Sequence, residues 1–469
     1  MDIKRTKSQS IDMDQLQTLR TNLRGKVFVQ GDEGYDTACL TWDAKTFEQH
    51  PALIVLPTVA DDVLAAVAYA QQQNLPIAVQ GGGHGHPYPA DGALLVNFAH
   101  MTNIQINAEK AIARVEPGAK AGDLVQAASA HGLAPLNGFA PTVGVVGYLL
   151  NGGIGWLARQ YASGAGSIRA AELVTADGHL LHVDENTSAD LLWGLRGGGG
   201  NFGIVTALEF SLYPVKEIFG GQVVYPIELG KEVLSAYVEW IKTTPDELTS
   251  ALRIMQFPPV PAIPDALRGK TTIVVMASYN GEAKVGETLL QPMRTLGKPL
   301  IDTFARMPYS QVATISNDPA EAPPVFFATE SAALNDLAKS DIAMLVDLVA
   351  NSESGIRLVE MRQLGGALAR QPENTLPFGI HRANLHISVI AAAPSPDQLE
   401  KGKQAMATIL QGLLPRTTGE VILSLAGNAS LELTRAAYTP ANYQRLVALK
   451  QRYDPQNLFR FNYNIPPSQ

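Results

Sequence analysis

The residues most suited to chemistry in this chain form the loop Gln80-Gly81-Gly82-Gly83-His84-Gly85-His86. Three consecutive glycines remove every side chain that could hold a flat ligand away from the backbone. The His84 imidazole stands directly behind them. The loop therefore predicts a site in which a flat ligand lies against the backbone, with one histidine beside it.

Other kinds of site find less support in the sequence. His84 and His86 could hold a metal ion, but acids nearby are few and Asp91 is the nearest, so we predict no metal site. No P-loop, H-E-x-x-H or G-x-S-x-G motif occurs, so hydrolysis by those routes is not supported. Residues 198–203 match the dinucleotide fingerprint G-x-G-x-x-G, but the alternating, β-branched residues after them predict a strand where that motif needs a helix.

The elements around the loop predict where it lies in the fold. Residues 53–56 are apolar and predict a buried strand; Thr58 and Asp61 then resemble a capping box, and apolar positions at 63, 64, 67 and 70 predict a helix. Asn74 ends the helix, and residues 77–79 predict the next strand. This strand–helix–strand order indicates a parallel pair with a crossover helix, whose ligands bind beyond the carboxyl ends of the strands. The glycine loop occupies that position.

Composition sets broad limits on function. The 469 residues are 46% hydrophobic and 17% charged, which is typical of a packed enzyme of two or three lobes. A net charge of −8 argues against nucleic acid or an anionic membrane as a partner. No apolar stretch reaches the ~18 residues that a membrane helix needs. No secretory signal is visible, and the single cysteine, Cys39, excludes an internal disulfide, so we expect a cytoplasmic protein.

The remaining chain predicts two different sheets. A second glycine-dense segment spans residues 141–156, a hairpin turns at Asp177-Gly178, and residues 188–195 predict a helix before a long strand at 204–212. Beyond Pro214, apolar alternating runs at 222–225, 252–256, 271–279, 356–363, 384–390 and 421–425 alternate with helices, the clearest at 233–241 and 399–413. These predict an antiparallel sheet with helices on one face. Residues 318–327 predict a loop.

Four motifs in this order resemble a known family. They are 79–84 with Asp91-Gly92, the segment from Pro141 through Trp156 to Arg159, the run Leu192-Trp193 to Val205, and the ending Tyr453-Asp454-Pro455 to Pro466. Together they resemble the FAD-binding domain of the p-cresol methylhydroxylase/vanillyl-alcohol oxidase superfamily and its berberine bridge enzyme-like branch. The resemblance implies an α+β fold: an FAD-binding PCMH-type domain over 1–216, an antiparallel-sheet substrate-binding domain flanked by helices over 217–428, and a C-terminal segment, 429–469, that returns to the FAD-binding domain.

The resemblance also implies a cofactor site. His84 corresponds to the histidine bonded to the 8α-methyl of FAD, and the glycine N–H groups would face the pyrophosphate. The cofactor-binding residues implied are Gln80, Gly81, Gly82, Gly83, His84, Gly85, Pro141, Thr142, Val143, Gly144, Gly147, Gly152, Gly153, Gly155, Trp156, Val205, Asn462 and Asn464.

Three positions depart from the family pattern. Ala140 replaces the cysteine that forms a second bond to flavin in two-link members, so a single link through His84 is expected. Gln80 replaces a frequent arginine. Leu425 stands where many members carry a tyrosine or phenylalanine. Val143, at the family's oxygen-gate position, leaves room for O2 and favours an oxidase over a dehydrogenase.

The catalytic base is left open between three candidates. His86 could point over the flavin ring or face solvent. His386 shares a strand face with Asn384 and Ser388, which could look at the flavin or at solvent. Tyr148 could lie at the cofactor or pack. On another strand, Glu360 and Arg362 share a face and could pair with each other.

We therefore expect an FAD-dependent oxidase. A small, hydrophobic or aromatic substrate resembling a secondary metabolite would lose a hydride to flavin N5, and O2 would be reduced to hydrogen peroxide. The alternatives are an oxidative cyclase of natural-product biosynthesis, a carbohydrate oxidase and a non-catalytic flavin-binding protein. The expected partners are the substrate and O2, and the expected state is a monomer or homodimer.

Overall fold

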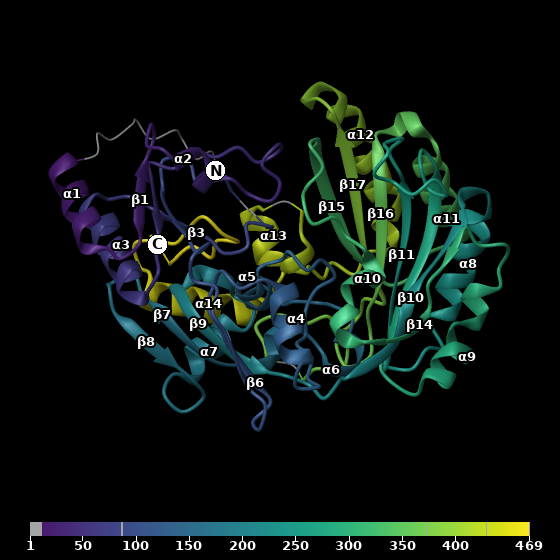
Figure 1. Cartoon of the computed structure of the whole chain (residues 1–469), viewed down its shortest axis with the longest axis horizontal. Helices are drawn as coiled ribbons and strands as arrows, with labels where there is room; N and C mark the ends of the chain where they lie inside the picture. Colours follow the sequence, from purple (N-terminus) through teal and green to yellow (C-terminus); the bar gives the residue numbers. More distant parts are fainter. Residues whose placement is uncertain (1–11, 86–87, 373, 428, 469) are drawn as a thin grey trace.

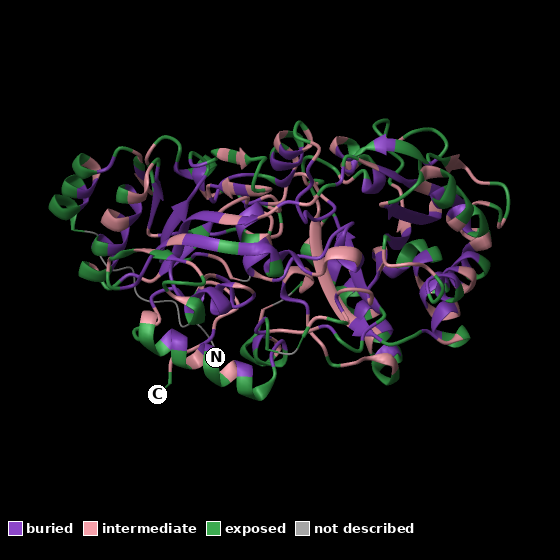
Figure 2. Cartoon of the chain, turned by 90° about the horizontal axis from the view of Figure 1, so that it is seen from below, coloured by how far each residue is buried: buried purple, intermediate pink, exposed green. Residues whose placement is uncertain are grey.

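The chain forms two lobes that lie side by side, each built on its own sheets (Figure 1). The structure is a computed structural model that describes residues 12–85, 88–372, 374–427 and 429–468. The first lobe contains a four-stranded and a five-stranded sheet, and the second contains an eight-stranded sheet. Seen from below, buried strands lie inside and exposed helix faces lie outside (Figure 2). The α+β fold expected from the sequence is confirmed.

The four-stranded sheet has the order β1-β2-β4-β3. Its strands are β1 (Lys26–Val29), β2 (Leu53–Leu56), β4 (Leu94–Asn97) and β3 (Ile77–Gln80). β2 and β3 are parallel, as predicted, but they are not neighbours, because β4 lies between them and pairs with both. All residues of β4 are buried, as a central strand requires, whereas Val79 of β3 is 45% exposed, as suits an edge strand.

Helix α3 (Ala60–Gln72) crosses between β2 and β3 and ends before Asn74, which has a φ of 53°. The expected capping box at Thr58 and Asp61 is off by one residue. Asp62 accepts the bonds instead: from the Thr58 N–H at 2.8 Å and from the Arg24 N–H at 2.8 Å. The acid one position later reaches both the start of its own helix and the preceding segment.

The five-stranded sheet has the order β5-β6-β9-β7-β8 and is antiparallel throughout. Its strands are β5 (Ile104–Asn107), β6 (Ile112–Val115), β9 (Ile204–Ser211), β7 (Ile168–Val174) and β8 (Leu180–Val183). The predicted hairpin at Asp177-Gly178 joins β7 to β8. A 3-10 turn, Gly199–Asn201, and then strand β9 follow the G-x-G-x-x-G match, which confirms that no Rossmann helix starts there.

The eight-stranded sheet forms the second lobe. Its order is β13 (Ile301–Asp302), β10 (Glu217–Pro226), β12 (Thr271–Tyr279), β11 (Leu248–Gln256), β16 (Ile356–Gln363), β17 (Leu385–Ala393) and β15 (Phe326–Leu334), with β14 (Ala305–Pro308) also on β10. Helices α8 (Gly230–Trp240), α9 (Ala283–Arg294), α11 (Lys339–Ala350) and α12 (Pro396–Leu413) cover its outer face over one large apolar core (Figure 1). The inner face is turned toward the first lobe.

Two predictions for this lobe are wrong in part. The run 421–425 is not a strand but contains a 3-10 turn, Leu423–Leu425. The run resembles a strand because its neighbouring side chains point to opposite sides of a connection between the lobes. Ile422 packs in one core cluster and Leu423 in another. The loop predicted over 318–327 ends earlier, because the edge strand β15 begins at Phe326.

The remaining helices complete the first lobe and the link between the lobes. They are α1 (Met13–Asn22), α2 (Tyr35–Cys39), α4 (Ala121–Ser129), α5 (Val145–Leu150), α6 (Ala158–Tyr161), α7 (Ala189–Leu195), α10 (Ala313–Ser316), α13 (Leu431–Ala436) and α14 (Pro440–Tyr453). The last two, yellow in Figure 1, come after the second-lobe sheet in sequence, and α14 packs on α7 in the first lobe. Within the described ranges, no helix is both long and apolar enough to cross a membrane.

Candidate functional site

The two glycine-dense segments meet backbone to backbone at the carboxyl end of β3. A methyl group built on Gly82 would lie 2.5 Å from the Gly144 nitrogen, and one on Gly144 would lie 2.6 Å from the Gly82 nitrogen. Neither position can carry a side chain unless the loops separate. The contact between Gly82 and Gly144, here called the glycine seam, therefore joins segments that lie far apart in the sequence.

His84 lies at the glycine seam and is held on two sides. Its Nε2 atom is 2.9 Å from the Thr142 hydroxyl oxygen. The Trp42 indole stacks on the imidazole with ring centroids 4.3 Å apart and an angle of 18° between the planes. The Trp42 backbone N–H also donates to the Gly83 carbonyl at 2.7 Å. The sequence indicated the histidine and Thr142 but not Trp42.

Gln80 braces the loop from inside the protein. Its side-chain amide donates to the Leu40 carbonyl at 2.9 Å and accepts from Gln49 Nε2 at 3.1 Å. Gln80 is buried, and its bonds fix the segment that leads to Trp42. Gly85 is exposed at the end of the loop, and the candidate base His86 lies outside the described residues.

The second glycine segment contains a short helix that the sequence did not reveal. The Pro141 and Val143 carbonyls accept from the Gly122 and Ala121 N–H groups at 2.8 and 2.9 Å, and α5 starts two residues after Val143. Apart from its chain neighbours and the backbone of its own helix, no described atom lies within 4 Å of the position where Gly147 would carry a methyl group. This helix therefore presents open space at Gly147, beside the glycine seam.

Tyr148 packs where the segment turns back. Gly152 and Gly153 have φ values of 113° and 72°, and a methyl group on Gly153 would lie 2.7 Å from the Tyr148 ring. A methyl group on Gly155 would collide with the Asn137 carbonyl oxygen at 1.7 Å. The Tyr148 hydroxyl is buried without a hydrogen-bond partner in the described chain. Burial raises its pKa, and nearby Arg362 only partly opposes this, so the hydroxyl stays protonated at neutral pH.

Trp156 and Val205 are core residues at the edges of this region. Trp156 is buried and stacks on Phe139, with ring centroids 3.8 Å apart and an interplanar angle of 3°. The Arg362 guanidinium lies 3.9 Å from the Phe139 ring centroid, on the inner face of the second-lobe sheet. Val205 is buried in the core of the first lobe. Trp156 therefore takes part in packing between the lobes.

The inner face of the second-lobe sheet carries a buried set of charges. Glu360 accepts from Arg362 Nε at 2.6 Å, as the sequence suggested, and from Arg253 Nε at 2.7 Å. Arg253 also pairs with Asp318 at 2.8 Å. Burial tends to raise the pKa of Glu360, but the two guanidinium groups outweigh it and lower the pKa to about 2. The carboxylate is therefore charged at neutral pH.

His386 lies beside this set, opposite Arg362 on the neighbouring strand. It is 2% exposed, and its Nδ1 atom finds no partner among the described groups. Burial, and then the charge of Arg362, lower the pKa of His386 to about 3. The imidazole is thus neutral at neutral pH and offers one unused polar nitrogen.

The C-terminal asparagines are positioned by a third residue, Asn201. Asn201 donates to the Tyr463 carbonyl at 3.0 Å and accepts from the Ile465 N–H at 2.9 Å. Asn462 donates to the Phe459 carbonyl at 3.1 Å, while the side-chain oxygens of Asn462 and Asn464 are buried without a partner in the described ranges. The sequence pointed to these two asparagines but not to the role of Asn201.

These features fit the FAD that the motifs imply. Five of the buried polar atoms that lack a partner in the described ranges belong to residues discussed above: the Tyr148 hydroxyl, Trp156 Nε1, His386 Nδ1 and the side-chain oxygens of Asn462 and Asn464. Buried polar groups normally have partners, so unused ones around a glycine-lined opening indicate a polar ligand. The described residues hold no cluster of three or more metal-binding side chains.

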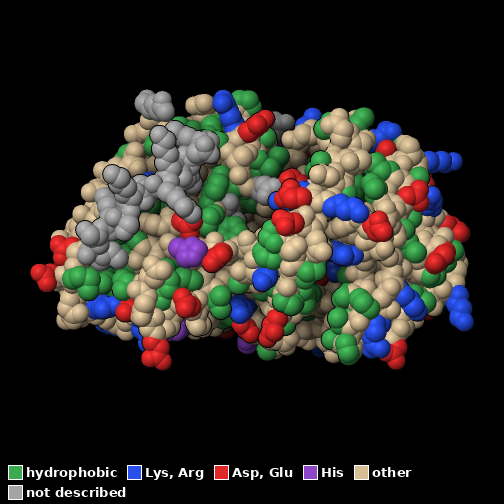
Figure 3. All heavy atoms as spheres, turned by 90° about the horizontal axis from the view of Figure 1, so that it is seen from above, with side chains coloured by type: hydrophobic (Ala, Val, Ile, Leu, Met, Phe, Trp, Pro, Cys, Tyr) green, Lys and Arg blue, Asp and Glu red, His purple; other side chains and the backbone are tan. Residues whose placement is uncertain are grey.

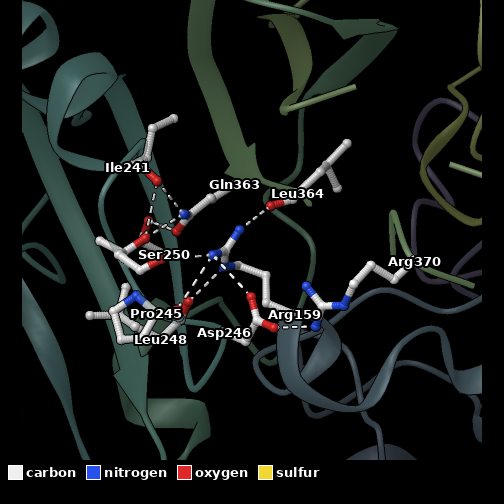
Figure 4. Close-up of polar contacts among 10 residues, drawn as sticks. Arg159, Ile241, Pro245, Asp246, Leu248, Ser250, Gln363, Leu364 and Arg370 are labelled. Atoms are coloured by element: carbon white, nitrogen blue, oxygen red, sulfur yellow. Dashed lines mark hydrogen bonds and ion pairs between the residues drawn. The ribbon is translucent and has the colours of Figure 1, made fainter. Parts of the chain in front are cut away.

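Arg159 locks the two lobes together below this region (Figure 4). Its guanidinium donates to the Leu248 carbonyl at 2.8 Å, to the Leu364 carbonyl and to the Thr244 carbonyl at 3.2 Å. Asp246 lies 3.8 Å from the same guanidinium and also pairs with Arg370. The motif from Pro141 to Arg159 therefore ends in a structural contact.

On the face shown in Figure 3, acidic and basic side chains are interspersed.

Comparisons with known proteins match two separate parts of the chain to family models. The family model described as an FAD binding domain matches residues 51–184, and the model described as berberine and berberine like matches residues 423–466. (R)-6-hydroxynicotine oxidase of Paenarthrobacter nicotinovorans is 30% identical over 95% of this chain and 97% of that protein. Chitooligosaccharide oxidase of Gibberella zeae is 26% identical over 89% of this chain and 87% of that protein. The crystal structure of 6-hydroxy-D-nicotine oxidase from Arthrobacter nicotinovorans superposes with a TM-score of 0.82 and 26% identity, covering 95% of this chain and 98% of that one.

Proposed function

The chain belongs to the berberine bridge enzyme-like family of FAD-linked oxidoreductases, and on that premise we propose that it is an oxidase carrying one covalent FAD link through His84. We further propose that it oxidises a small, hydrophobic or aromatic substrate and reduces O2 to hydrogen peroxide. The observation that carries the proposal is the position of His84, whose imidazole is held at the glycine seam by the Thr142 hydroxyl.

A single link follows from the residues around the seam. His84 supplies one nitrogen nucleophile, and Ala140, which precedes Pro141, has no group that could form a second bond. Cys39 is the only cysteine, and its pKa is raised by burial, which disfavours the reactive thiolate. Covalent attachment therefore depends on His84 alone.

When bound, FAD supplies the redox chemistry by accepting a hydride from the substrate and passing two electrons to O2. The protein orients the reacting groups and keeps water away. Val143 lines a small cavity with Gly144 and Tyr148, next to the glycine seam. A short branched side chain there supports access of O2 to the reacting face.

The substrate is proposed to bind between the seam and the inner face of the second-lobe sheet. His386 contributes a neutral nitrogen and Tyr148 a protonated hydroxyl, both available for hydrogen bonds. An aromatic substrate agrees with the relative whose name gives 6-hydroxynicotine as its substrate.

One alternative substrate class has a specific observation in its favour. A relative over most of the chain is named for oxidation of chitooligosaccharides, and the charged set at Glu360 and Arg362 could bind hydroxyl groups. A carbohydrate oxidase is therefore the second candidate. An oxidative cyclase would be recognised by a ring-closed product, and a non-catalytic flavoprotein by a flavin that no substrate reduces.

The cofactor proposal is tested on purified protein denatured in acid. The expected result is a yellow pellet whose intact mass exceeds that of the chain by one FAD, and a His84→Ala variant that releases all its flavin. A colourless pellet from the native sequence would refute the covalent link.

The substrate proposal is tested by anaerobic bleaching of the flavin absorbance with aromatic amines, phenols, alcohols and oligosaccharides. We expect bleaching by an aromatic compound and, after air is admitted, one hydrogen peroxide per substrate oxidised. Bleaching by sugars alone would establish the carbohydrate oxidase instead.

A further inference from the structure

We propose that Trp42 and Thr142 are positioning residues for the covalent attachment of FAD to His84. Trp42 fixes the plane of the imidazole, and Thr142 selects which of the two ring flips that share this plane is occupied. The proposal rests on the covalent link proposed above and adds two residues outside the bond itself. It also gives a role to the segment around Trp42, which precedes both glycine segments in the chain.

Trp42 has the geometry of a clamp on the histidine ring. Stacking at 4.3 Å and 18° leaves the edge of the imidazole, with its nitrogens, directed away from the indole face. The hydrogen bond from the Trp42 backbone N–H to the Gly83 carbonyl ties the Trp42 backbone to the residue next to His84. Gly83 has a φ of 69°, a conformation that side chains disfavour, so glycine permits this approach.

The segment that carries Trp42 is itself held in place. Gln80 donates to the Leu40 carbonyl, and Gln49 donates to the Cys39 carbonyl at 2.7 Å. Gln80 and Gln49 are both buried and bonded to each other at 3.1 Å. The end of β3 thus anchors the very segment that returns to cover the loop following it.

Thr142 selects one of the two ring flips. Its hydroxyl lies 2.9 Å from His84 Nε2, and it stands two residues before Gly144, which packs on Gly82 at the seam. A β-branched side chain has few rotamers, so the hydroxyl is presented in a fixed direction. The torsion that turns a histidine ring is broad and roughly two-fold. A half-turn keeps the ring plane but exchanges its nitrogen and carbon edges, and the hydroxyl favours the flip that presents Nε2.

Ring orientation matters because the link is a bond-forming step with strict geometry. One N–H bond of the imidazole and one C–H bond of the FAD methyl group are replaced by a C–N bond, and the two protons and two electrons leave to O2, giving hydrogen peroxide. The attacking lone pair lies in the plane of the ring, so a freely turning imidazole is seldom aligned. Holding both the ring plane and the ring flip is a form of preorganisation, which can raise a reaction rate by several orders of magnitude.

The test follows the covalent reaction itself, separately from turnover. Flavin-free protein is mixed with FAD, and the covalent fraction is followed over time by flavin fluorescence of the denatured chain and by intact mass. The affinity for FAD before attachment is measured by fluorescence quenching. For Trp42→Ala and Thr142→Val we expect attachment to slow by at least about tenfold, with FAD affinity changed only a few-fold.

Conservative and remote variants serve as controls. Trp42→Phe and Thr142→Ser keep an aromatic face and a hydroxyl, and should attach FAD at nearly the native rate. Thr288→Val removes a hydroxyl from the exposed side of α9, where it bonds the Lys284 carbonyl, and should have no effect.

Two failures are distinguishable. If the native protein binds FAD but never links it, the covalent proposal itself is wrong. If the native protein links FAD and both Trp42→Ala and Thr142→Val link it at the same rate, only the positioning role is wrong. Thr142→Val is close to isosteric, so it decides the question even if Trp42→Ala does not fold.

Discussion

Lys450 and Asp454 form an ion pair of 2.6 Å at the end of α14 with neither side chain exposed to solvent. The Lys450 ammonium also donates to the Asn201 and Phe459 carbonyls at 3.0 and 3.1 Å. Asp454 accepts from the Leu458 and Phe459 N–H groups at 2.7 and 2.9 Å. The pair therefore joins the C-terminal helix to Asn201 and to the segment that carries Asn462 and Asn464.

Lys450→Met is expected to lower the free energy of unfolding by about 3 kcal/mol or more, because it leaves a buried carboxylate without its counter-ion. Urea unfolding measures the change. Lys231→Met is the matched control, since Lys231 pairs with Asp347 on the exposed surface, and should change stability by less than ~1 kcal/mol. Equal effects of the two variants would show that the buried pair has no special role.

Arg159→Met is expected to loosen the contact between the lobes. It leaves the carbonyls of Leu248, Leu364 and Thr244 without their donor, at a cost on the order of 3 kcal/mol. Limited proteolysis and chemical denaturation would report the change. Arg370→Met removes an exposed partner of the same Asp246 and should behave like the native protein; a comparable loss there would point to Asp246 instead.

Gly82→Ala and Gly147→Ala separate packing from ligand contact. A methyl group on Gly82 meets the backbone of Gly144, so that variant should lose roughly 1–3 kcal/mol of stability together with FAD binding. A methyl group on Gly147 meets no described atom and removes a glycine from a helix, so the apoprotein should gain up to about 1 kcal/mol.

The same Gly147→Ala protein should bind FAD more weakly than the native one, because the methyl group would enter the proposed cofactor space. Thermal unfolding of the apoprotein and FAD titration give the two numbers. Unchanged FAD affinity would place the cofactor elsewhere.

The buried His386 is expected to make stability depend on pH. Its pKa is about 3 in the folded chain and ~6.5 when unfolded, so between these values the unfolded chain binds more protons. Its contribution is therefore complete above pH ~6.5 and is lost as pH falls toward 3.

His386→Asn should flatten the decline in unfolding free energy between roughly pH 6.5 and 4.5, by up to one proton, or about 1.4 kcal/mol per pH unit. Glu360 does not interfere in this window, because its own contribution is lost only between ~4.3 and 2. Urea unfolding at several pH values makes the measurement. Parallel curves for the variant and native proteins would mean that His386 is not shielded as the structure shows.

Much of the fold could be predicted because local patterns carry it. The Asp177-Gly178 turn predicted its hairpin, and the period of the apolar residues predicted α3, α8 and α12. Strand order could not be predicted, since β4 takes the centre of its sheet through burial on both faces, which only the assembled layers determine. The run at 421–425 misled because a connection that packs on two cores alternates like a strand.

The candidate site was only partly visible in the sequence. Glycines and His84 stand together, so spacing revealed them. Trp42 stands in a polar segment without a pattern, and its meeting with His84 depends on the fold of the chain between them. Arg362 and Phe139 likewise come from different lobes. Such residues are recognised by the side chains that an aromatic group packs against, and these neighbours are known only from coordinates.

The contact between Gly82 and Gly144 also sets an order of events during biosynthesis. The first half of the seam leaves the ribosome well before the second, and Lys450, which holds the segment carrying Asn462 and Asn464, emerges after both. A chain still short of Lys450 therefore has no complete cofactor site, and FAD loading follows the synthesis of α14. Any flavin retained by a denatured sample would then count the molecules that had already folded as far as α14.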